Sequence, residues 1–95
     1  MAEHGALMHE PEDDVAVAIA DLPAGSQVRM VTIEGQAVGT LTLVQDIPLG
    51  HKFATRDIAP GSQVIKYGRS IGQASQAIPK GAHAHTHNIK SVRWA

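Results

Sequence analysis

The sequence predicts a small all-β domain made of short strands joined by glycine- and proline-containing turns. Short runs alternate larger apolar residues with small or polar ones, which is the two-residue period of a strand. Turn signals recur about every 8–12 residues, as they do in compact β-domains. No stretch shows the roughly 3.6-residue spacing of an amphipathic helix. The 95 residues suffice for one small domain with a thin core.

Residues 1–12 are polar and acidic, and we expect them to form a flexible leader ahead of a domain that covers residues 13–95. His4 and His9 lie in this leader, so both are predicted to be solvated rather than functional. The leader has no apolar stretch of the kind found in secretory signal peptides, and we expect the protein in the cytoplasm.

The first three strands of the domain are expected between residues 15 and 44. In residues 15–20, valine and isoleucine alternate with alanine, which predicts a strand buried on one face and closely packed on the other. Composition also admits a helix here, but the β-branched residues and the Leu-Pro-Ala-Gly stop favour a strand. Residues 28–33 and 36–44 then form two strands joined by a tight turn at Gly35. Gly39 predicts a bulge or a close backbone approach.

The rest of the chain is divided into shorter segments. A short extended segment is expected at residues 51–54, and one further strand, punctuated by glycine, at residues 64–68 and 70–72. Residues 73–78 fit a strand or a short helix. Tyr67 is expected in the core with its hydroxyl hydrogen-bonded. Because exposed tryptophan is costly, Trp94 either packs on the domain or anchors a partner chain.

A unit of aliphatic residue, proline, any residue and glycine recurs along the chain. It occurs at residues 22–25, 47–50 and 78–81, and a shifted version occurs at residues 58–61. Proline at its second position and glycine at its fourth predict a type I turn. An aspartate precedes three of the four units, where its carboxylate can accept a hydrogen bond from a turn amide. These aspartates are Asp21, Asp46 and Asp57.

Composition excludes several classes of function. The net charge is -1, so there is no basic excess to neutralise the phosphates of a nucleic acid. The chain has no cysteine, which excludes a disulfide framework, a thiolate zinc site or an iron–sulfur cluster held by this chain. No apolar run approaches the ~20 residues of a membrane-spanning helix. We therefore expect neither nucleic-acid nor membrane binding.

Histidine at every second position makes the stretch after Gly81 the strongest candidate for chemistry. In an extended strand His83, His85 and His87 share one face, and imidazole is both a proton-transfer group and the commonest metal ligand. Same-face neighbours in a straight strand lie ~6.6 Å apart, so the outer two lie ~13 Å apart and cannot hold one ion together. Either two adjacent histidines act with ligands from elsewhere, or the strand bends near Asn88. A solvated, histidine-rich edge is the alternative.

A fourth histidine follows an earlier turn of the same kind. His51 comes directly after Gly50, and His51 and Lys52 would point to opposite faces of a short strand. A single histidine at the start of a strand is as readily a hydrogen-bonded structural residue as a ligand. The sequence leaves both roles open for His51.

Several strings together resemble the SAF domain of altronate dehydratase-type enzymes. They are Asp14 to Ala18, Ile47 to Ala54, Arg56 to Ile58, Val64 to Gly68, Ile71-Gly72 and His83 to Asn88. That family includes altronate and galactarate dehydratases and the small, alpha subunit of sulfolactate sulfo-lyase. The resemblance runs from about Asp13 to Trp94 and implies the β-clip fold.

The resemblance also implies a function. In longer members this domain precedes a large catalytic domain, whereas a chain that ends at Ala95 resembles the split form with a separate large subunit. The closing residues 90–94 resemble those of sulfo-lyase small subunits more than those of the fused sugar-acid enzymes. The expected function is that of the small subunit of a hydroxy-acid lyase, which eliminates water from a sugar acid or sulfite from sulfolactate.

The family resemblance implies a divalent metal, iron(II) or manganese. Removing a proton α to a carboxylate needs a base and a cation that holds the developing negative charge. We expect His51, His85 and His87 as catalytic residues, Lys52 and Asn88 as substrate-binding residues, and His83, His85 and His87 as metal ligands. Two other classes remain open: a non-catalytic β-clip binding module, and a structural subunit that stabilises a large partner.

Overall fold

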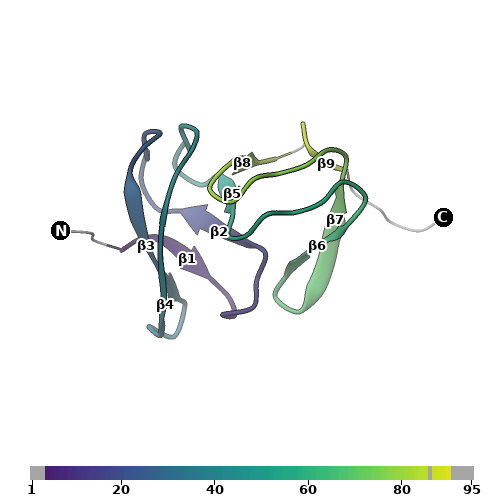
Figure 1. Ribbon diagram of the computed structural model, residues 1–95. Helices are drawn as coiled ribbons and strands as arrows, with labels where there is room; N and C mark the ends of the chain where they lie inside the picture. The colour runs from purple at the N-terminus through teal and green to yellow at the C-terminus, as the bar shows by residue number, and fades with distance from the viewer. Residues whose placement is uncertain (1–3, 86, 91–95) are drawn as a thin grey trace.

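A computed structural model describes residues 4–85 and 87–90 of the chain, and in this part of the chain the fold is all-β with no helix. The strands form two sheets, one of six strands and one of three, as Figure 1 shows. None of the described segments is therefore a helix long and apolar enough to cross a membrane. The all-β prediction is confirmed.

The larger sheet has the strand order β4-β3-β1-β2-β5-β8 and the smaller one the order β6-β7-β9. In chain order the strands are β1 (His4–Met8), β2 (Val15–Ala18), β3 (Gln27–Thr32), β4 (Ala37–Thr42), β5 (Lys52–Ala54), β6 (Gln63–Lys66), β7 (Arg69–Ala74), β8 (His83–Ala84) and β9 (Ile89–Lys90). Strands β1 and β3 run parallel, and every other pair is antiparallel.

The prediction of a flexible leader is wrong for residues 4–8. They form β1, which lies between β2 and β3 inside the larger sheet. The side chains of Ala6 and Met8 are buried in the core. His9, predicted to be solvated, is half-buried and its ring lies 4.6 Å from that of Tyr67.

Two hydrophobic clusters meet along β2 and β5. One gathers around Phe53 and includes Ala16 and Ala18, and the other includes Val15 and Ala54. Alternate side chains of these strands therefore enter different clusters, which is why a strand of valine and alanine is buried on both faces. The predicted close packing of this strand is confirmed, although it ends at Ala18.

The repeated turns have a different frame from the predicted one. In each unit the turn is closed by the amide of the residue that follows the glycine. This amide donates to the carbonyl of the unit's second residue, as Ser26 does to Pro23 and His51 to Pro48. Glycine is thus the third residue of the turn, and φ is 86° at Gly25 and 84° at Gly50. Positive φ at the third position makes these type II turns, so the type I prediction is wrong.

The turns pair with each other through the aliphatic residues and the aspartates. Leu22 pairs with Ile47, and Ile58 pairs with Ile78, through isolated β-bridges. The predicted aspartate bonds are present, but each reaches across to the opposing turn. Asp21 accepts from Leu49, Asp46 from Ala24 and Asp57 from Lys80, each at 2.8 Å. The turns therefore hold together segments about 25 residues apart in the sequence.

The two hairpins differ in how well they were predicted. Gly35 closes the β3–β4 turn with φ at 94°, and the strand register shifts next to Gly39, so the predicted turn and bulge are both confirmed. Tyr67 and Gly68 form the β6–β7 turn, both with positive φ. Tyr67 is 60% exposed, so the prediction that it lies in the core is wrong. In residues 73–78 only the first two extend β7, and Trp94 lies outside the described residues.

Candidate functional site

The candidate site is a cluster of four imidazole rings next to the end of the larger sheet. Strand β8 pairs with β5, which aligns His83 with Phe53 and places it close to the residue that precedes β5, His51. The Nδ1 atom of His51 lies 2.8 Å from the Nε2 atom of His83. The sequence predicted both histidines as candidates, and the pairing of β5 with β8 brings them into contact.

The extended stretch is shorter than predicted, because β8 ends at Ala84 and the chain then turns back. Asn88 holds this turn: its Oδ1 accepts from the His85 amide at 2.9 Å, and its Nδ2 donates to the His83 carbonyl at 2.8 Å. The amides of Asn88 and Ile89 both donate to the His85 carbonyl. The bend that the sequence allowed near Asn88 is therefore present.

This turn overcomes the ~13 Å separation expected of a straight strand. The ring centroids of His83 and His87 lie 5.2 Å apart, and those of His83 and His85 lie 5.6 Å apart. His51 lies 4.8 Å from His85 and 5.0 Å from His83 by the same measure. His83 thus lies at the centre of the cluster, in contact with the other three rings.

Burial and charge repulsion act together on the central ring. Burial lowers the pKa of His83 below its ordinary value, and the neighbouring rings of His51, His87 and His85 lower it further. His83 and His51 are half-buried, whereas His85 and His87 are exposed. The lowered pKa favours the neutral form of His83 at pH 7.

Two residues that sequence reasoning missed fix the start of β8. The His83 amide donates to Oε1 of Gln45 at 2.9 Å, and the Gly81 carbonyl accepts from the Val44 amide at 3.0 Å. A Cβ atom at Gly81 would lie 2.5 Å from the Thr42 carbonyl oxygen, so only glycine fits. Glycine after proline signalled the turn, but nothing in the sequence signalled the contact with the end of β4.

The two residues predicted to bind substrate occupy different environments. The Asn88 side chain is buried, and its two polar atoms are bonded to backbone groups. The half-buried Lys52 side chain has no hydrogen bond or ion pair to any described residue. The role of Lys52 in substrate binding stays a prediction, whereas Asn88 positions the histidines.

The residues described in the structure contain no group of three or more histidine, aspartate or glutamate side chains arranged to hold a metal ion. Pairs of neighbouring imidazoles are present, and a pair is a partial ligand set of the kind that suits iron. A metal at this cluster would therefore take further ligands from outside residues 4–85 and 87–90. The metal prediction for His83, His85 and His87 stays a prediction.

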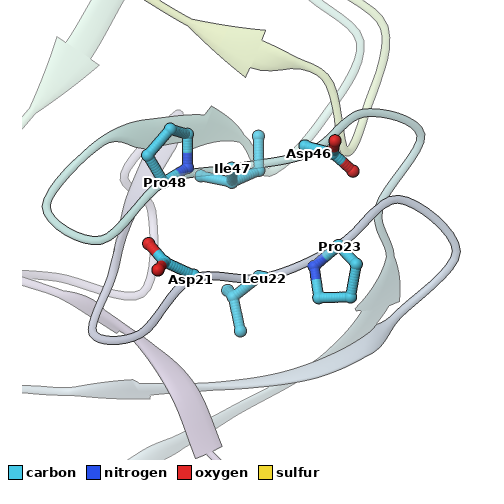
Figure 2. A pocket seen from close by; sticks show the side chains of 6 residues that line it. All are labelled: Asp21, Leu22, Pro23, Asp46, Ile47 and Pro48. Atoms are coloured by element: carbon cyan, nitrogen blue, oxygen red, sulfur yellow. The ribbon is translucent and has the colours of Figure 1, made fainter.

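An apolar hollow of about 320 Å³ lies between the first two repeated turns. Figure 2 shows the segment with Leu22 and Pro23 running alongside the segment with Ile47 and Pro48. Its aspartates each use one oxygen to hold a turn amide. Its other lining residues are apolar and both carboxylates already hold turns, so the histidine cluster is the better candidate for chemistry.

Residues 4–92 match the altronate/galactarate dehydratase SAF domain. The chain is 49% identical over 79 residues to altronate dehydratase of Escherichia coli (strain K12), which is 83% of this chain and 15% of that protein. It is 35% identical over 89 residues to the (2R)-sulfolactate sulfo-lyase subunit alpha of Chromohalobacter salexigens, which is 93% of this chain and 95% of that subunit. The corresponding subunit of Paracoccus pantotrophus is 46% identical over 54 residues, which is 57% of this chain and 81% of that subunit.

Proposed function

The chain belongs to the family of altronate/galactarate dehydratase SAF domains, and from this premise we propose that it is the small subunit of a two-chain hydroxy-acid lyase. The reaction is the elimination of water from a sugar acid or of sulfite from sulfolactate. The observation that carries the proposal is the cluster of four imidazoles around His83.

The sulfo-lyase relatives favour a separate large subunit, because both are named as alpha subunits. The match covers nearly all of a sulfo-lyase alpha subunit but a small part of a fused altronate dehydratase. A subunit of this size has little room to enclose a polyhydroxy acid, and exposed His85 and His87 would face a partner surface. We place the active centre at the contact between this chain and the large subunit.

The histidines supply proton transfer at that contact. The 2.8 Å contact between His51 Nδ1 and His83 Nε2 is a hydrogen bond in which one ring donates and the other accepts. Because the lowered pKa favours the neutral form of His83 at pH 7, this pair can accept a proton removed from the carbon next to the substrate carboxylate. The exposed ring of His85, in contact with both, returns a proton to the leaving group when that group is hydroxide.

We also propose a divalent metal, iron(II) or manganese, held by a neighbouring pair among His83, His85 and His87 and completed by ligands from the large subunit. When bound, such an ion stabilises negative charge that develops on the substrate carboxylate. Lys52, which has no hydrogen bond or ion pair to the residues that the structure describes, binds a carboxylate of the same substrate. Asn88 acts by holding the turn that carries His85 and His87.

The test is turnover by the assembled enzyme. The tagged chain is recovered from extracts of its source cells with its partners, and the complex is assayed with sulfolactate for sulfite and with altronate for the dehydrated acid. His85→Ala and His51→Ala should each lower kcat at least a hundredfold. Thr40→Ala, on an exposed position of β4, should leave kcat unchanged. The metal content of the complex, measured by mass spectrometry, should fall in His83→Ala and His87→Ala.

The alternative roles give a different result. If the large partner retains full activity when the small chain is removed, the chain is a binding or structural module. The same conclusion follows if His85→Ala assembles normally and turns over at the parent rate.

A further inference from the structure

A second, polar hollow lies at the opposite end of the larger sheet from the histidine cluster. It has a volume of about 290 Å³ and is lined by His9, Glu10, Glu34 and Tyr67, among others. These residues come from the β1–β2, β3–β4 and β6–β7 connections, which Figure 1 shows together at the lower edge of the molecule, away from β8. The proposed lyase chemistry uses none of them.

Tyr67 has a position in this hollow that the turn itself does not explain. Its φ is 59°, in the left-handed region that favours glycine or asparagine at this place in a hairpin turn. The buried carboxylate of Asp13 accepts the Tyr67 amide at 2.8 Å and so maintains this conformation. The ring packs against the His9 ring at 4.6 Å and is 60% exposed, so one aromatic face is held in place at the surface.

The charge of the hollow is negative. Glu10 and Glu34 both line it, and the ion pair found among the described residues joins Arg56 to Asp14 rather than to either glutamate. Lys66 and Arg69 lie on the same hairpin as Tyr67 but do not line the hollow. An exposed aromatic face beside two carboxylates attracts an organic cation.

A metal ion fits this hollow less well than a planar organic cation. Among the residues described in the structure, His9, Glu10 and Glu34 do not converge as a metal-binding group. A guanidinium group is planar, stacks on an aromatic ring and donates several hydrogen bonds to separated carboxylates. It therefore matches the wider arrangement of these side chains.

The apolar surface beside the hollow indicates that the cation belongs to a polypeptide. Ile33, next to Glu34 at the tip of the β3–β4 hairpin, is 60% exposed, as is Tyr67 on the neighbouring hairpin. A free guanidinium compound would leave Ile33 in water, whereas the apolar residues beside an arginine in a peptide would cover it.

We propose that this hollow binds the guanidinium group of an arginine side chain presented by a partner polypeptide. The guanidinium plane stacks on the Tyr67 ring and donates hydrogen bonds to Glu10 and Glu34. The site is independent of the histidine cluster, so it holds whether or not the chain is a lyase subunit.

The test is an NMR titration of the ¹⁵N-labelled full chain with two blocked tripeptides, Leu-Arg-Leu and Leu-citrulline-Leu. Citrulline has the shape of arginine without its charge, so it is a matched control. The arginine peptide should cause saturable shifts of the amides of Glu10, Glu34 and Tyr67, and the citrulline peptide should bind at least tenfold more weakly. Blocked Ser-Arg-Ser, which lacks the apolar neighbours, should also bind more weakly than Leu-Arg-Leu.

Two variants make the result specific to the hollow. Glu34→Gln removes one carboxylate, and Tyr67→Asn removes the ring while keeping a residue that tolerates positive φ, so the turn is retained. Each should weaken the arginine peptide several-fold, whereas Thr40→Ala should have no effect. Equal binding of the arginine and citrulline peptides, or the absence of saturable shifts, would overturn the proposal. Equal binding of Ser-Arg-Ser and Leu-Arg-Leu would overturn its polypeptide part.

Discussion

At the scale of single residues, Asn88 decides whether the histidines form a cluster. Its carboxamide satisfies one backbone donor and one backbone acceptor on the same turn, and it is buried while doing so. It acts together with the bonds that the Asn88 and Ile89 amides donate to the His85 carbonyl. The spacing of the histidines alone therefore does not predict the cluster. The asparagine that follows them is needed as well.

Replacing Asn88 should open the turn. Asn88→Ala leaves the His85 amide and the His83 carbonyl without their partner, and we expect a loss of about 1–3 kcal/mol of unfolding free energy. Urea titration measures the stability, and the ring-proton shifts of the four histidines report whether His87 still contacts His83. Gln76→Ala, an exposed change, is the control. Unchanged histidine shifts in Asn88→Ala would show that the turn does not depend on this side chain.

Acid should destabilise the cluster. Burial and the neighbouring rings lower the pKa of His83, so the unfolded chain binds a proton at this position more readily than the folded one. The stability contributed by the neutral ring is therefore complete above the unfolded pKa of about 6.5 and is lost as the pH falls through the lowered folded value.

Urea midpoints between pH 7.5 and 5 should fall in the parent chain. They should fall less steeply in His83→Gln, which cannot titrate. His9→Gln leaves all four rings of the cluster in place. This variant should therefore keep the pH dependence of the urea midpoint that comes from the cluster. An identical slope in the parent and in His83→Gln would contradict the prediction.

At the scale of elements, the repeated turns were recognised from sequence but placed one residue out of frame. Proline and glycine mark a turn reliably. They do not show which carbonyl accepts the closing hydrogen bond, and this carbonyl defines the first residue of the turn. The aspartate bonds could be anticipated as turn bonds. That each one crosses to another turn could not, because the partner turn is set by tertiary pairing.

The turns at residues 58–61 and 78–81 form a pair with one aspartate bond instead of two. In the other cases an aspartate before the aliphatic residue accepts from the third residue of the opposing unit. Ala77 occupies the aspartate position opposite Pro60, which has no N–H to donate. Loss of the acceptor therefore accompanies loss of the donor.

Restoring both groups should restore the bond. Ala77→Asp alone should give no gain, because Pro60 cannot donate. In a Pro60→Ala background the same change should stabilise the chain by about 0.5–1.5 kcal/mol, the usual net value of one hydrogen bond. A double-mutant cycle measured by urea unfolding gives this coupling free energy. A coupling of zero would mean that the two positions do not face each other.

At the scale of the whole molecule, β1 was the largest element missed. Its residues lack a clear alternation, and they are held by pairing with β3 and β2, which lie further along the chain. The local sequence pattern cannot predict a strand whose extended conformation is stabilised mainly by pairing with other strands. Strands within residues 15–54 were found because their apolar alternation and turn residues agree, whereas β9 was not predicted.

The buried carboxylate of Asp14 joins the two sheets. It lies just before β2 of the larger sheet, and it accepts from the Ile65 amide in β6 at 2.7 Å and from Nε of Arg56 at 2.6 Å. The side chain is 5% exposed, so loss of these bonds leaves a buried amide without a partner. Asp14→Ala should lower the unfolding free energy by about 2–4 kcal/mol.

The two bonds of Asp14 can be separated by their variants. Arg56→Gln removes the ion pair of an exposed guanidinium with Asp14 and the exposed bond from Arg56 to the Asp57 carbonyl, and it should cost less than about 1 kcal/mol. Hydrogen exchange should then show β6 and β7 opening faster than β3 and β4 in Asp14→Ala, because the smaller sheet loses one of its bonds to the segment before β2. Uniform acceleration across both sheets would mean that the two sheets open as one unit and that Asp14 stabilises the whole chain rather than their contact.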